Sequence, residues 1–224
     1  MSSSAGSLPA LATMAAGMFP PPFVVAVTDP RADYPDLHPT EAPHTSGMIA
    51  KRLREFRAGR HAARTAMREL GLSDPAVPVG PDRAPIWPDG INGSITHCDT
   101  ACIAIAHRGR ETVGIDIEPD QPLPDELIDL VCSPAEQARL ATADRGRMAR
   151  VIFSAKEAVF KAQYPITRQM IDFNAMDITP DLANQKFLAV FQTPVGLFEK
   201  GFAITGRIAL ENGFILSGMT LNPR

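Results

Sequence analysis

A long helical segment with short strand segments near it occurs in each half of this chain. In the first half, apolar positions recur in alternating steps of four and three residues, which predicts a helix over about residues 46–70 that ends at Gly71. In the second half, residues 148–164 have the same helical character. The sequence therefore predicts an α+β fold made of two similar halves that pack together.

The strand candidates are short apolar or alternating runs. We expect strands at 23–27, 103–107 and 112–118, the last two paired across the turn Arg108-Gly109-Arg110. Three more follow at 187–191, 202–210 and 214–221, and Asn212-Gly213 between the last two is a strong hairpin signal. A second helix is expected at 133–142, where Ser133 precedes a first-turn proline. We divide the chain into a loose N-terminal tail (1–17), an N-terminal half (18–118) and a C-terminal half (119–224).

Composition excludes several classes of protein. The 224 residues are 45% hydrophobic and 21% charged with a net charge of −3, which is typical of a soluble globular protein and not of a nucleic-acid binder or a membrane-surface binder. The run Pro20-Pro21-Pro22 argues against a secretory signal or membrane span near the N-terminus. Three cysteines without a framework spacing indicate a reduced, cytoplasmic protein. An anionic ligand must therefore be bound by locally placed Arg and Lys.

Two motifs indicate phosphate chemistry with a metal ion. In Gly114-Ile115-Asp116-Ile117-Glu118, two carboxylates project from the same strand face, which suits Mg²⁺; the alternative is two solvated side chains on an exposed face. In the segment 153–162, FSAKEAVFKA, Glu157 and Lys161 lie one helical turn apart. They form either a surface ion pair or a metal ligand and a phosphate-binding lysine.

Two further segments contain candidate anion-binding groups. Arg60 falls in the apolar stripe of the first long helix, where a guanidinium needs a carboxylate or a phosphate partner. Gly59 beside it costs about 1 kcal/mol of helix stability and indicates close backbone approach. The segment Gly93-Ser94-Ile95-Thr96-His97 offers donors to phosphate oxygens, although a histidine in such a segment is more often structural.

Taken together, the segments 52–71, 79–98, 113–118 and 153–162 resemble the Sfp-type 4′-phosphopantetheinyl transferase family, particularly its siderophore-synthesis branch, which includes enterobactin synthase component D. The resemblance implies two α+β halves related by a pseudo-twofold axis, with coenzyme A in the cleft between them. It also implies the site residues. The metal ligands are Asp116, Glu118 and Glu157; the catalytic residues are Glu157, Asp116 and Lys161; the coenzyme A-binding residues are Arg52, Arg60, Arg83, Ser94, Thr96, His97, Lys156 and Lys161.

The implied activity is transfer of phosphopantetheine from coenzyme A to a serine of an apo acyl or peptidyl carrier protein, releasing adenosine 3′,5′-bisphosphate. We expect a Mg²⁺-dependent monomer, with Mn²⁺ as a possible substitute, that binds neither nucleic acid nor membrane. Glu157 is the candidate general base, directly or through a water on the metal. The alternative is an inactive coenzyme A-binding module. A PD-(D/E)xK nuclease fits poorly, because Pro119 follows the second acid and the lysines lie on a distant helix.

Overall fold

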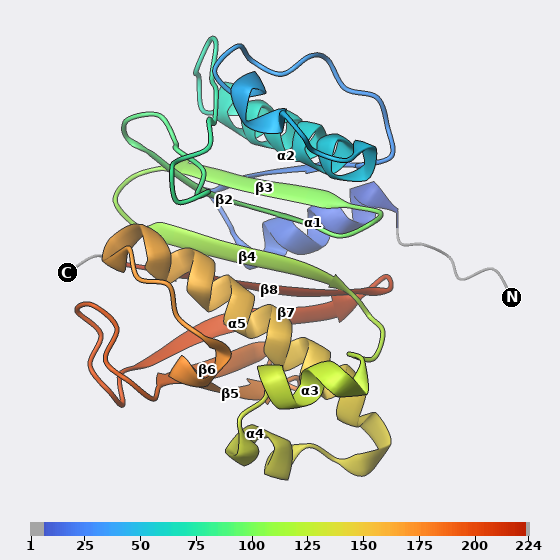
Figure 1. The fold of residues 1–224 in the computed structure, drawn as a ribbon, viewed down its shortest axis with the longest axis vertical. Helices are drawn as coiled ribbons and strands as arrows, with labels where there is room; N and C mark the ends of the chain where they lie inside the picture. The colour runs from blue at the N-terminus through green and yellow to red at the C-terminus, as the bar shows by residue number, and fades with distance from the viewer. Residues whose placement is uncertain (1–6, 223–224) are drawn as a thin grey trace, which may run out of the picture. The chain divides into compact units, whose positions relative to one another are not determined.

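The structure is a computed structural model that describes residues 7–222, and these form two compact units, residues 7–111 and 112–222 (Figure 1). Each unit contains an antiparallel sheet with a long helix packed on it, which confirms the predicted α+β class. The second unit begins with strand β4 (Thr112–Pro119) rather than near Glu118, because the whole strand pairs with β8 (Phe214–Leu221).

The first unit has a three-stranded sheet in the order β1-β3-β2, formed by β1 (Val24–Thr28), β3 (Cys102–Arg108) and β2 (Ile91–His97). Helix α2 (Ala50–Glu69) packs on this sheet. The approach is close at Gly59, where an added Cβ would lie 3.1 Å from Cγ2 of Ile95. The predicted strand at 23–27 is confirmed, and so is the long helix predicted at about 46–70, which begins at Ala50, whereas β2 was not predicted as a strand.

An N-terminal helix, α1 (Leu8–Met18), packs against β1. Ser7 caps it by accepting a hydrogen bond from the amide of Ala10, and Pro9 lies in the first turn, where its missing N–H costs nothing. Leu11 is fully buried. The expected loose tail at 1–17 is therefore wrong from Leu8 onward, and residues 1–6 lie outside the described part of the chain.

The second unit has a five-stranded sheet in the order β4-β8-β7-β6-β5 (Figure 1). Its remaining strands are β5 (Met176–Asp181), β6 (Lys186–Phe191) and β7 (Ala203–Glu211). The strands predicted at 187–191, 202–210 and 214–221 are confirmed. So is the hairpin, because Asn212 and Gly213 have φ of 55° and 79°, the left-handed pair that a tight type I′ turn requires.

Helix α5 (Arg145–Thr167) lies across this sheet and packs on β4 and β8 (Figure 1). Its apolar residues join those of the sheet in one core, in which Val151, Ala155 and Val159 meet side chains such as Phe187 and Phe191. Two short helices, α3 (Asp125–Val131) and α4 (Pro134–Arg139), precede it. Ser133 and Glu136 form a capping box at the start of α4, as its Ser-Pro signal predicts.

The predicted pairing of the strands at 103–107 and 112–118 is wrong. β3 pairs with β1 and β2, and β4 pairs with β8. The intervening residues are held by the first unit: the ring of His107 bonds the carbonyl of Glu111, and Arg108 donates to the carbonyl of Leu70.

All three cysteines are free thiols, and no helix within residues 7–222 is long and apolar enough to cross a membrane.

Candidate active site

One face of β4 lies directly against α5. Thr112 donates from Oγ1 to the carbonyl of Ala162 at 2.6 Å, and Gly114 leaves so little space that an added Cβ would lie 1.9 Å from the carbonyl oxygen of Ala158. Alternation along a strand places Asp116 and Glu118 on this same face. The glycine thus allows helix and strand to touch, and the two carboxylates follow it along the contact.

Each of the two carboxylates forms an ion pair with a cation of α5. Lys161 donates from Nζ to Oδ1 of Asp116 at 2.7 Å and to the carbonyl of Ile115 at 3.1 Å. Arg150 donates from Nη1 to Oε2 of Glu118, also at 2.7 Å. Asp116 is 4% exposed, so its charge lies in a region of low polarity where pairing is strong. Lys161, considered above as an i,i+4 partner of Glu157, thus bonds the strand at Asp116, and its charge lowers the pKa of Glu157.

Glu157 belongs to the same electrostatic group. Burial raises the pKa of its carboxyl above the usual value, Lys161 lowers it, and the charge of Asp116 raises it further. The pKa of Glu118 is also raised, first by burial and then by Asp116, while Arg150 and Lys161 oppose the change. Asp116 therefore lies within electrostatic reach of both glutamates, and a bound cation would relieve the repulsion among the three.

The donor set fits a magnesium ion, although the side chains are not gathered into a preformed cage. Among residues 7–222, no three His, Cys, Asp or Glu side chains gather closely enough to form a metal-binding group. Mg²⁺ does not require one, because it is usually held by one or two carboxylates together with water and the phosphates of a substrate. Asp116 and Glu118 offer hard oxygen donors of this kind from adjacent positions on one face.

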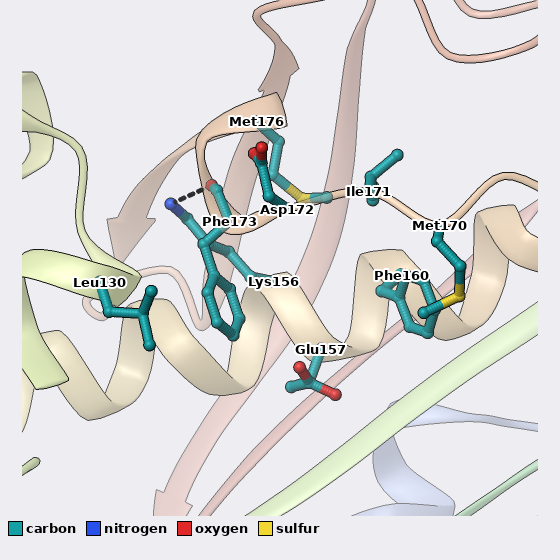
Figure 2. Close-up of a pocket in the computed structure, with 9 residues that line it drawn as sticks. All are labelled: Leu130, Lys156, Glu157, Phe160, Met170, Ile171, Asp172, Phe173 and Met176. Atoms are coloured by element: carbon teal, nitrogen blue, oxygen red, sulfur yellow. Dashed lines mark hydrogen bonds between the residues drawn. The ribbon is translucent and has the colours of Figure 1, made fainter.

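Lys156 differs from the expectation. Its side chain is 1% exposed, and Nζ donates to Oε2 of Glu136, to the carbonyl of Val131 and to the carbonyl of Phe173 at 2.7–2.8 Å. An ammonium group has three protons, so all of them are used. Figure 2 shows Lys156 and Glu157 on opposite sides of α5. The predicted contact of Lys156 with coenzyme A phosphates is therefore wrong: the residue ties α5 to α4 and to the segment before β5.

A cavity of about 320 Å³ opens beside Glu157 (Figure 2). Its wall is mainly apolar: Phe160 of α5 and Met170 meet on one side, and Leu130 of α3 and Phe173 lie on the other (Figure 2). Leu130 and Met170 are 60% and 74% exposed, so part of the cavity wall faces solvent. The cavity wall comes from three separate segments: α3, α5 and the residues before β5.

In the first unit, Arg60 is a buried cation at the centre of α2. It is 7% exposed, its guanidinium lies 4.4 Å from the centre of the Phe56 ring, and burial lowers its pKa to about 10. Its Nε has no hydrogen-bond partner among the described residues. The carboxylate of Glu41 is bound by Arg64, one turn further along the helix. A buried donor of this type fits an anionic ligand.

At the start of the same helix, Arg52 contacts His97 at the end of β2. Nη1 of Arg52 is 2.5 Å from Nε2 of His97 and also reaches Glu55. His97 and Ile95 point to the α2 side of β2, and alternation places the buried side chains of Ser94 and Thr96 on the other face. The structure thus joins Arg52 to His97 and separates Ser94 and Thr96 from both.

The remaining predicted residue, Arg83, is exposed in the turn between Gly80 and Ala84 and has a φ of 67°. Conversely, sequence reasoning did not connect Arg150 with the carboxylate of Glu118 and did not predict the cavity. Arg150 could have been found from helical spacing, because it precedes Glu157 by two turns and Lys161 by three on one face of α5. The cavity residues had no such signal, since they come from separate segments.

Comparison with known proteins agrees with this architecture. Residues 40–107 match the profile of the 4′-phosphopantetheinyl transferase N-terminal domain, and residues 112–206 match that of the 4′-phosphopantetheinyl transferase superfamily. The chain is 36% identical over 203 residues to the 4′-phosphopantetheinyl transferase Npt of Nocardia iowensis, covering 84% of this chain and 91% of that protein.

Two other relatives have comparable identity. The 4′-phosphopantetheinyl transferase Svp of Streptomyces mobaraensis is 41% identical over 166 residues, 70% of this chain and 67% of that protein. Enterobactin synthase component D of Escherichia coli K12 is 37% identical over 153 residues, 63% of this chain and 72% of that protein. The chain therefore belongs to the 4′-phosphopantetheinyl transferase superfamily, and its chemistry is that of a transferase.

Proposed function

We propose that this protein transfers the phosphopantetheine arm of coenzyme A to a serine hydroxyl of an apo acyl or peptidyl carrier protein in a Mg²⁺-dependent reaction. The observation that carries the proposal is the contact between β4 and α5, where Asp116, Glu118, Glu157 and Lys161 belong to one electrostatic group. Such a group combines carboxylate oxygens that can bind a metal ion with a lysine that can bind a phosphate. Phosphoryl transfer requires both.

Asp116, Glu118 and Glu157 are the residues proposed to hold the magnesium ion. When bound, Mg²⁺ supplies charge neutralisation at the pyrophosphate of coenzyme A. The three side chains differ in what they contribute: the two on β4 are held by ion pairs, and Glu157 comes from the helix beside the cavity. Mn²⁺ is expected to substitute, because it accepts the same oxygen donors.

In the proposed group transfer, the bond that forms at phosphorus is matched by a bond that breaks, and the proton released is accepted by a residue of the site. The serine oxygen forms a bond to the phosphorus that carries the pantetheine arm, and the bond from that phosphorus to the bridging oxygen breaks. Adenosine 3′,5′-bisphosphate leaves. Glu157 accepts the serine proton, a role favoured by a carboxylate whose pKa is raised by burial. Lys161, paired with Asp116, stabilises the phosphate that departs.

The two ends of coenzyme A need different surroundings, and the structure supports a proposal for each. The cavity beside Glu157 has the apolar lining and a volume suited to the pantetheine arm. Arg60, with Arg52 and His97, is proposed to bind the 3′-phosphate, because a buried guanidinium donor is suited to a doubly charged anion. Arg83, Ser94 and Thr96 remain predicted coenzyme A-binding residues, Arg83 in its exposed turn and the other two on the face of β2 opposite to His97.

The carrier protein is proposed by class only. Enterobactin synthase component D among the relatives favours an acyl or peptidyl carrier protein of siderophore or other secondary-metabolite synthesis. Free cysteines are compatible with a cytoplasmic enzyme, and we propose that it acts as a monomer, since each metal-binding residue is supplied by one chain.

Intact-protein mass spectrometry tests the proposal. The protein is incubated with coenzyme A, Mg²⁺ and a panel of apo carrier proteins, and a mass gain of one phosphopantetheine on a carrier is expected. EDTA and Glu157→Gln should both abolish the gain. Binding of coenzyme A without transfer to any carrier would instead indicate an inactive binding module, and the absence of both would contradict the proposed function.

A further inference from the structure

Arg150 of α5 donates a hydrogen bond to the Glu118 carboxylate and forms an ion pair with it. It lies in the first third of the helix, well before the segment with Glu157 and Lys161. Both partners of the ion pair are mostly shielded from solvent, with side chains 17% exposed. A pair of this kind is stronger than an exposed surface pair, because water screens it less.

The guanidinium of Arg150 is itself fixed by the backbone. Besides donating from Nη1 to Glu118 at 2.7 Å, it donates from Nη2 to the carbonyl of Pro122 at 3.1 Å and from Nε to that of Gln121 at 3.4 Å. Three donors of one planar group are thus directed to three acceptors. Because the group is planar and rigid, two contacts to the loop after β4 determine where the third can hold the carboxylate.

Glu118 needs such support more than Asp116 does. A glutamate side chain has one more rotatable bond than an aspartate, and Glu118 lies near the end of β4, where the strand leaves the sheet at Pro119. Asp116 is confined by burial and by Lys161. Without Arg150, the Glu118 carboxylate could rotate away from Asp116, whose like charge repels it.

Arg147 provides a natural comparison within the same helix. It makes a bidentate ion pair with Asp120, at 2.6 and 2.8 Å, and so ties the same loop to α5. The carboxylates that interact with Arg147 within residues 7–222 are those of Asp120 and Asp144, and neither belongs to the proposed metal site. Both arginines therefore support the loop, and only Arg150 reaches the carboxylates of the proposed site.

We propose that Arg150 is a positioning residue for metal binding: it holds the Glu118 carboxylate in the orientation from which it ligates the cation beside Asp116. The inference rests on the proposed function, because it assigns Arg150 a role toward the metal that Glu118 would hold. Residues that orient a ligating carboxylate typically contribute a factor of about 10 to 100 in metal affinity. Arg150 is expected to act at the lower end of that range, since it supports one of three ligands.

The test measures metal binding directly. Free Mn²⁺ is titrated by electron paramagnetic resonance into the protein saturated with coenzyme A, for wild type, Arg150→Gln, Arg150→Lys and the matched control Arg147→Gln. Thermal unfolding of each variant is recorded in parallel, as is coenzyme A binding in the presence of EDTA. The Kd for Mn²⁺ is expected to rise about tenfold in Arg150→Gln. It should rise less in Arg150→Lys, because lysine keeps the positive charge but lacks the planar guanidinium with its several donors.

Arg147→Gln should leave the Kd for Mn²⁺ within about twofold of wild type even where it lowers the unfolding temperature, because its contacts lie outside the carboxylate set. If Arg150→Gln does not fold, the Kd for Mn²⁺ of Arg150→Lys is compared with that of wild type instead. Wild-type Mn²⁺ affinity in the Arg150 variants, or equal weakening in Arg147→Gln, would overturn the inference. If wild type transfers phosphopantetheine but the Arg150 variants bind Mn²⁺ normally, only this inference fails; if wild type neither binds Mn²⁺ nor transfers, the proposed function itself fails.

Discussion

Gly114 is the residue whose replacement should reveal how closely the fold and the site depend on each other. In Gly114→Ala, the new methyl carbon would lie 1.9 Å from the carbonyl oxygen of Ala158 and 2.7 Å from the amide nitrogen of Ala162. Ordinary van der Waals contact begins near 3.4 Å. Since both obstacles are helix backbone, no side chain can move aside, and α5 must separate from β4 by about 1.5 Å locally, the difference between those distances.

Such a separation affects contacts on both sides of the glycine. The hydrogen bond from Thr112 to Ala162 (2.6 Å) and the ion pair from Lys161 to Asp116 (2.7 Å) span the same helix–strand contact. Lengthened by about 1.5 Å, both would exceed hydrogen-bonding distance. Overpacking of this kind costs about 1–3 kcal/mol or more, and misplacing catalytic groups by about 1 Å can reduce the rate by roughly 100-fold.

Urea denaturation and the carrier-modification assay measure the two effects separately. Gly114→Ala should lower the free energy of unfolding by about 3 kcal/mol and reduce kcat/KM by about 100-fold at temperatures where it is still folded. The matched control is Gly17→Ala in α1, where an added Cβ meets nothing within 4 Å. That change should be neutral or stabilise by up to about 1 kcal/mol, because alanine favours helix. Wild-type stability and activity in Gly114→Ala would refute the close contact between β4 and α5.

Three further predictions follow from individual side chains. Lys156→Met should destabilise by about 3–5 kcal/mol in urea denaturation, because Glu136 would remain buried without its cation, and adding Glu136→Gln should recover part of the loss. Arg60→Ala should weaken binding of coenzyme A by roughly 10-fold or more in calorimetry, leave dephospho-coenzyme A binding unchanged, and exceed any effect of the exposed Arg54→Ala. At pH 8, iodoacetamide should label the partly exposed Cys98 before Cys132. Burial raises the pKa of Cys132 to about 11, so that only about 0.1% of it is thiolate at pH 8. Raising the pH toward 11 should increase labelling of Cys132, and equal labelling rates of the two cysteines at pH 8 would contradict the burial of Cys132.

Sequence patterns predicted the elements better than their partners. The turn at Asn212-Gly213 and the capping box at Ser133 are local signals, and both form as expected. The pairing of β3 with β4 failed because a short connection is only a statistical indication of a hairpin. Contacts from His107 and Arg108 hold the connection in the first unit, and these depend on tertiary structure that no local pattern contains.

The same distinction applies to the site. Asp116 and Glu118 could be placed on one face because strand alternation is regular, whereas Lys156 was misplaced despite lying next to Glu157. Adjacent helical residues differ by about 100° in direction, so neighbours in a motif do not share a face. Lys156 therefore turns to Glu136 and the carbonyls around it, while Lys161, one turn after Glu157, reaches the strand.

The contact between β4 and α5 has two roles that place opposite demands on residue size and charge. Close approach requires small residues, and Gly114 against the backbone at Ala158 meets that need. Carboxylates on the same strand face are then desolvated and repel each other, and burial first and the charge of Asp116 second raise the pKa of Glu118. Lys161 and Arg150 on the facing helix offset part of that cost before any cation binds. A strand face with acids two residues apart is therefore compatible with a packed helix when that helix supplies cations at matching positions, and this is why the arginine two turns before Glu157 belongs in the description of the site.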